Sequence, residues 1–76
     1  MNGMETVREA ARRTGVSLIT IGPSIGRSKT YVSAKITNGT DPGAGTLAAM
    51  LEPCGHVLCV LPRSDVPASA MVIDPR

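Results

Sequence analysis

The sequence predicts a mainly α-helical fold of four short helices, followed by a short C-terminal β segment. Three observations favour this fold class. Apolar residues recur at helical spacing over roughly the first fifty residues, Gly, Ser and Asn-Gly divide that stretch into short pieces, and two continuous apolar runs follow at residues 56–61 and 70–73. We therefore divide the chain into a helical domain, residues 1–55, and a C-terminal β segment, residues 56–76.

The first helix is expected over residues 4–14, because small and apolar side chains recur there at helical spacing. Gly15 is a suitable end, since glycine readily adopts the left-handed conformation found after a helix. Arg12 and Arg13 lie off the apolar stripe, so we expect them to be solvated. The stripe consists of Val7, Ala10, Ala11 and Thr14.

The second helix is expected over residues 18–25, with Ser17 as its cap. Leu18, Ile21 and Ile25 have the spacing of a buried face. The Gly22-Pro23 pair is unfavourable here, because proline inside a helix costs about 3 kcal/mol. We therefore expect this helix to be short, kinked or partly 3₁₀.

The third helix is expected over residues 29–37, after a turn at Gly26 and with Ser28 as its N-cap. Val32 and Ile36, four residues apart, can face the core together. Asn38-Gly39 ends the helix. A fourth helix follows, with Thr46 as a possible cap, and its expected members are Thr46, Leu47, Met50 and Leu51.

The pattern changes after the fourth helix. Residues 56–61 form an apolar run closed by Pro62, which is typical of a buried strand, and residues 70–73 form a second run. An isolated pair of strands is marginal in water, so we expect these segments to pair or pack with a second copy of the chain. The predicted dimerisation residues are Val57, Leu58, Cys59, Val60, Leu61, Met71, Val72 and Ile73.

Composition supports assembly of two copies. The 76 residues are 42% hydrophobic but include no Trp, no Phe and one Tyr, so the core must be built from aliphatic side chains. A small core of this kind favours a dimer. No apolar run approaches the roughly 20 residues of a membrane span, and the first residues lack a signal-peptide pattern. We expect a cytoplasmic protein without a membrane partner.

Charge is distributed unevenly along the chain. Residues 6–40 carry six Lys or Arg and one Glu, whereas residues 41–76 carry two cations and four acids. A basic first half suits a surface that binds a polyanion, and the more acidic second half leaves another face for a different task.

The segments VREAARRTGVSL, IGRSKTYVSAKITNG and TLAAML resemble the XRE-type helix-turn-helix family, which includes the phage lambda repressor and Cro. The resemblance covers about residues 4–55. Its most specific part is the turn at residues 26–28, which enters a helix with Tyr31-Val32-Ser33 that closes at Asn38-Gly39. It implies a four-helix lambda-repressor-like domain that binds double-stranded DNA as a homodimer.

The resemblance also implies roles for individual residues. Side chains at the start and along one face of the third helix would contact base edges, and flanking residues would contact phosphates. The base-contacting set is Lys29, Thr30, Ser33, Ala34 and Thr37. The phosphate-contacting set is Ser17, Arg27, Tyr31, Lys35, Asn38 and Thr40.

Metal binding and catalysis have little support in the sequence. Cys54, His56 and Cys59 are possible zinc ligands, but their spacing matches no standard site and a fourth ligand is missing. A chain of this length leaves little room for a substrate cleft, and GPSIGRSKT lacks the Gly-Lys-Ser order of a phosphate-binding loop. We expect no enzymatic activity, no metal, no cofactor and no small-molecule ligand.

The resulting prediction is a sequence-specific DNA-binding transcriptional regulator, a Cro-like repressor that acts as a homodimer on a palindromic operator. Two alternatives stay open. The chain could be a protein-interaction module, such as an antitoxin or a phage adaptor, that grips a partner with its apolar C-terminal segment. It could also be a metal-sensing regulator that uses Cys54, His56 and Cys59.

Overall fold

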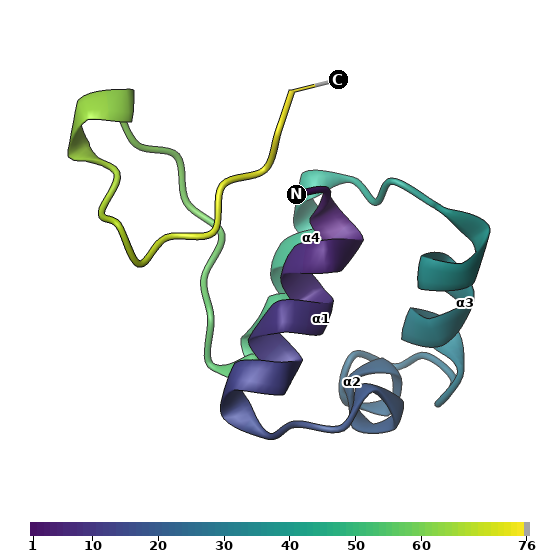
Figure 1. Ribbon diagram of the computed structural model, residues 1–76. Coiled ribbons are helices and arrows are strands. Elements are labelled where there is room, and N and C mark those ends of the chain that lie inside the picture. Colours follow the sequence, from purple (N-terminus) through teal and green to yellow (C-terminus); the bar gives the residue numbers. More distant parts are fainter. Residues whose placement is uncertain (76) are drawn as a thin grey trace.

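The computed structural model describes residues 1–75. Four α-helices, α1 (Gly3–Thr14), α2 (Leu18–Ser24), α3 (Tyr31–Asn38) and α4 (Ala44–Leu51), are followed by two 3₁₀ turns, η1 (Glu52–Cys54) and η2 (Arg63–Asp65). Helices α1 and α4 lie side by side, α2 crosses below them, and α3 stands on the opposite side of α1 from the C-terminal tail (Figure 1). The prediction of a mainly helical domain with four helices is confirmed.

Helix α1 begins one residue earlier than expected because Asn2 caps it. The Asn2 side-chain oxygen accepts from the Glu5 backbone N–H, and the Glu5 carboxylate accepts from the Asn2 N–H, both at 2.8 Å. Gly15 ends the helix at φ 72°, as predicted. Of the predicted stripe, Thr14 is the exception. It is exposed, and its hydroxyl donates to the Ala10 carbonyl at 2.7 Å.

Helix α2 is short, as the Gly22-Pro23 pair predicts. It is a regular α-helix of seven residues that ends one residue after Pro23, so the missing proline N–H disrupts only the last turn. Ile21 is fully buried, and Leu18 and Ile25 pack against the core. Ser17 stands at the cap position, but its side chain makes no capping hydrogen bond.

The predicted cap of the third helix is wrong. Helix α3 begins at Tyr31 rather than Lys29, and Ser28 uses its carbonyl, not its hydroxyl, to accept from the Tyr31 N–H at 3.2 Å. The cause is the tight connection from α2, in which the Arg27 N–H donates to the Gly22 carbonyl at 2.8 Å and places Ser28 in the turn. The predicted end is right, because α3 stops at Asn38 and Gly39 has φ 64°.

Helix α4 begins at Ala44 with Gly43 as its N-cap, so Thr46 lies inside the helix and does not cap it. Its apolar face closes the core. The fully or largely buried hydrophobic side chains are Met4, Val7, Ala10, Ala11, Ile21, Val32, Leu47, Met50, Leu51 and Cys54. Every one of these residues precedes residue 55.

The prediction of a C-terminal β segment is wrong for the described chain, because residues 1–75 contain no strand. Residues 56–62 form no helix, turn or strand, and residues 66–75 contain only a turn at Ala68-Ser69; η2 joins these two segments, which we call the arms. Among the described residues no backbone hydrogen bond joins the two arms, and a groove lies between them. Pro62 and Pro67, which flank the connecting turn, have no N–H to donate to such a pair. The predicted burial of the first arm also fails, since Val57 is 81% and Val60 is 97% exposed.

Candidate nucleic-acid interface

Residues 18–38 form a helix, a tight turn and a second helix, and Gly22 sets how closely these elements approach. A Cβ atom at Gly22 would lie 1.9 Å from the Ser28 carbonyl oxygen and 3.2 Å from the Tyr31 Cβ. Only glycine therefore permits this contact between α2 and the start of α3. Gly26 completes the turn with φ 77°, a conformation that side-chain-bearing residues rarely adopt.

The packing of α3 leaves one face free. Val32 is fully buried and Ile36 packs partly against the core, which fixes the helix on its inner side. All five predicted base-contacting residues are exposed on the remaining surface. Lys29 and Thr30, however, belong to the turn that precedes α3, and only the other three lie on the helix. They are Ser33, Ala34 and Thr37.

The predicted phosphate-contacting residues surround this surface. Ser17, Arg27, Asn38 and Thr40 are exposed, and Tyr31 and Lys35 are half-buried.

The Tyr31 ring holds two of these cations near each other. The Arg27 guanidinium carbon lies 5.4 Å from the ring centroid and the Lys35 Nζ lies 4.9 Å from it. These are cation–π distances, so the aromatic ring reduces the freedom of both positive groups. The result is a small cationic cluster in which Arg27, from the connection before α3, and Lys35, from the last turn of α3, share the Tyr31 ring.

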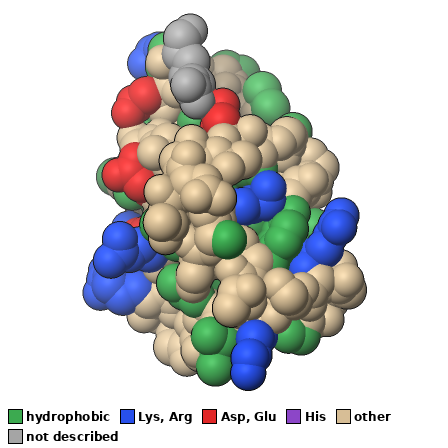
Figure 2. All heavy atoms as spheres, turned by 90° about the vertical axis from the view of Figure 1, so that its right-hand side faces the viewer, with side chains coloured by type: hydrophobic (Ala, Val, Ile, Leu, Met, Phe, Trp, Pro, Cys, Tyr) green, Lys and Arg blue, Asp and Glu red, His purple; other side chains and the backbone are tan. Residues whose placement is uncertain are grey.

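The α2–α3 surface has no acidic residue of its own, since residues 10–40 contain neither Asp nor Glu. The face that carries α3 shows Lys and Arg side chains mainly across its middle and lower parts, while acidic side chains and a further basic one lie towards its top and upper left (Figure 2). This distribution favours an anionic partner on the lower part of the face.

Arg12 and Arg13 are exposed, as expected, and both are also paired with Glu9. The Arg12 Nε donates to the Glu9 carboxylate at 2.8 Å, and the Arg13 Nε lies 2.9 Å from the same group. Hydrogen bonds from Arg12 and then from Arg13 lower the pKa of Glu9 to about 2. The end of α1 therefore adds less positive potential than its two arginines suggest. The spacing of three and four residues could have indicated these pairs from the sequence.

Cys54, His56 and Cys59 do not form a metal site. Cys54 is buried, and this burial raises the pKa of its thiol, whereas Cys59 is exposed on the tail. The His56 Nδ1 lies 2.8 Å from the Cys54 carbonyl oxygen, so that ring nitrogen is engaged with backbone. Among residues 1–75, no group of His, Cys, Asp and Glu side chains is arranged to hold a metal ion.

Over the same residues, the structure contains no helix with the length and apolar character needed to cross a membrane. No protein-family model, curated protein or solved structure matches this chain.

Proposed function

We propose that this chain is a sequence-specific DNA-binding transcriptional regulator with an XRE-type helix-turn-helix domain, acting as a repressor. The observation that carries the proposal is the α2–α3 arrangement. Val32 anchors α3 to the core, Gly22 brings α2 against its start, and an exposed polar surface without acidic residues faces outward.

In this proposal α3 enters the major groove of double-stranded DNA. Lys29 donates to guanine O6 or N7, and Thr30 offers a hydroxyl or a methyl group to thymine. The short side chains of Ser33 and Ala34, both exposed, allow the helix to approach the base edges closely. These contacts supply the sequence preference.

Phosphate contacts position the helix in the groove. The cluster of Arg27 and Lys35 on the Tyr31 ring is suited to one sugar-phosphate strand, because both cations contact the same ring. Ser17, Asn38 and Thr40 add hydroxyl and amide donors at the edges of the same surface.

The regulator acts as a homodimer on a roughly palindromic operator. Two α3 helices then read half-sites about one helical turn, roughly 34 Å, apart. Occupation of the operator would repress transcription by excluding polymerase.

The test is selection of bound duplexes from a random DNA library, followed by binding measurements on the selected and on scrambled sequences. We expect Lys29→Ala and Thr30→Ala to reduce the ratio of specific to random affinity, by about tenfold for a loss of 1.4 kcal/mol. Lys35→Ala is the matched control, since loss of a phosphate contact weakens binding to both sequences alike.

Two results would contradict this assignment. If the library selection enriched no sequence, the proposal of sequence-specific DNA binding would be contradicted. If Lys29→Ala lowered the affinity for specific and for random DNA equally, Lys29 would contact phosphate and not a base edge.

A protein-interaction module is the second candidate, and the exposed tail favours it. Val57 and Val60 are exposed large hydrophobic residues on the first arm, where a partner protein could cover them. A salt titration separates the two functions. DNA binding weakens steeply with salt through counterion release, whereas an apolar protein interface does not.

A further inference from the structure

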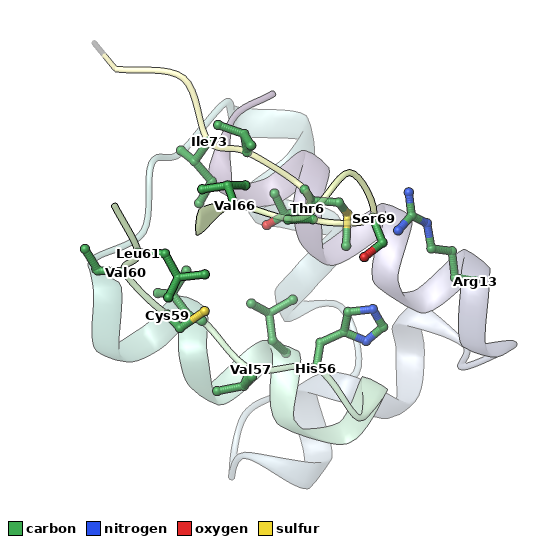
Figure 3. Close-up of a pocket in the computed structure, with 15 residues that line it drawn as sticks. Thr6, Arg13, His56, Val57, Cys59, Val60, Leu61, Val66, Ser69 and Ile73 are labelled. Carbon is green, nitrogen blue, oxygen red and sulfur yellow. The ribbon is translucent and has the colours of Figure 1, made fainter. Parts of the chain in front are cut away.

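The C-terminal tail and the helical body enclose a groove of about 490 Å³. Val57, Cys59 and Leu61 lie along one side of the groove, and Val66 and Ile73 lie along the other (Figure 3). Thr6, Arg13 and Leu51 from the helical body complete the lining. The groove therefore separates the two arms whose continuous apolar runs predict strands.

The tail concentrates the apolar surface that the single chain leaves exposed. Seven large hydrophobic residues are exposed among the described residues, and five of them lie on the two arms. A patch of this kind on a small protein usually marks an interaction site. The five residues are Val57, Val60, Leu61, Val72 and Ile73.

The charge of the lining indicates what can fill the groove. Among its fifteen lining residues there is no carboxylate, and the one formally charged group, Arg13, is already paired with Glu9 at 2.9 Å. An uncharged apolar occupant therefore fits better than an amphipathic acid, which would need a free cation. Residues 57–61 of this chain are such a segment, because they carry no charged side chain and form no helix or turn.

The uncharged groove and most of the exposed large hydrophobic residues lie on the same C-terminal tail, which favours the tail of a second copy as the occupant. Residues 57–61 line the groove and are themselves apolar and uncharged. When two copies meet, each copy can therefore both supply the inserted segment and accept one. Such reciprocal contact gives a closed two-fold dimer.

We propose that a second copy of this chain occupies the groove, with residues 57–61 of each copy inserted between the two arms of the other. Insertion buries Val57 and Val60, and it gives the backbone of each arm a partner strand, as in β-strand addition. This inference deepens the homodimer of the proposed function. It requires no DNA, so it is tested on the protein alone.

The first test is the oligomeric state of the full chain, measured by sedimentation over a wide range of concentrations. We expect a dimer, and we expect Val60→Asp to raise its Kd by more than about a hundredfold, because the charge would be buried without a partner. Ile19→Asp is the matched control. Ile19 is also an exposed hydrophobic residue, at 57%, but it lies on α2 away from the tail, so this variant should dimerise normally.

Circular dichroism of both variants checks that the helices are retained, since Val60 and Ile19 lie outside the buried core. A wild-type chain that stays monomeric at all concentrations overturns the proposal. So does a dimer that Val60→Asp leaves intact.

The second test locates the inserted arm. In a mixture of isotope-labelled and unlabelled chains, we expect nuclear Overhauser contacts between copies that join Val57 or Leu61 methyl groups to the Met71 methyl group. A dimer that lacks these contacts would overturn the proposal that residues 57–61 insert into the partner's groove.

A distance measurement separates this inference from DNA binding. Spin labels at Ser33→Cys, in a Cys59→Ser chain, report the separation of the two α3 helices in the dimer. Contacts between the arms together with an α3 separation far from roughly 34 Å would support the inserted arm and contradict the two-groove DNA mechanism.

Discussion

At the scale of single residues, Gly22 has the clearest structural role. As a sequence feature it weakens α2, but in the folded chain it makes room for the Ser28 carbonyl. A poor helix former at this position is therefore required by the contact between α2 and the turn before α3. Helix propensity alone ranks glycine as unfavourable at position 22, because the propensity scale takes no account of a neighbouring segment.

We expect Gly22→Ala to destabilise the protein by about 1–3 kcal/mol, as overpacking does, because backbone and not a flexible side chain must move. Gly45→Ala is the control, since a Cβ at Gly45 in α4 meets nothing within 4 Å. That variant should be neutral or stabilising by about 0.5–1 kcal/mol. Urea unfolding measures both, and equal effects of the two substitutions would contradict the close approach.

Glu9 gives a prediction about pH. Its pKa is lowered to about 2 by Arg12 and Arg13, so the folded chain favours the ionised carboxylate. The stabilising contribution is therefore fully present above the ordinary value of 4.5 and is lost as pH falls towards 2. An NMR titration of the Glu9 carboxyl should show this low pKa, and Arg12→Met with Arg13→Met should return it towards 4.5. A normal pKa in the unaltered protein would mean that the pairs do not persist in solution.

At the scale of elements, α3 shows how one buried residue orients a helix. Val32 is its only fully buried side chain among residues 31–38, and this anchor turns Ser33 and Thr37 outward. The prediction that Val32 and Ile36 both face the core is confirmed, since Val32 is buried and Ile36 packs partly against the core. The predicted start of the helix is wrong, because a hydrogen bond from the Tyr31 N–H to the Ser28 carbonyl places Lys29 and Thr30 in a turn before α3.

We expect Val32→Ala to cost about 2 kcal/mol of stability, because it removes buried apolar atoms and leaves a cavity. Ser33→Ala changes an exposed neighbour and should alter stability by less than about 0.5 kcal/mol. Thermal unfolding compares the two variants. A large effect of Ser33→Ala on stability would mean that this face is not free to meet DNA.

At the scale of the whole molecule, the chain separates into a body with a core and a tail without one. The described core residues span residues 4–54, whereas the tail contributes partly buried side chains such as Leu58 and Met71 and exposed polar contacts between residues 72–74 and Met1. The tail therefore adds little to the stability of one copy.

Deletion of residues 56–76 should consequently leave a folded monomer. We expect the helical circular dichroism signal to be retained and the dimer to disappear in sedimentation. A truncated chain that is folded and still dimeric would place the dimer interface on the helical body and refute the role of the tail.

The sequence by itself determined the number of helices, their apolar faces and the glycine ends at Gly15 and Gly39, because these depend on interactions within a few residues of one another. It also located the exposed polar surface of α3. Only the tertiary structure decided where α3 begins, why residue 22 must be glycine, and that the two C-terminal runs remain apart as arms. Each of these depends on which distant segment lies beside it, and local spacing carries no information about that neighbour.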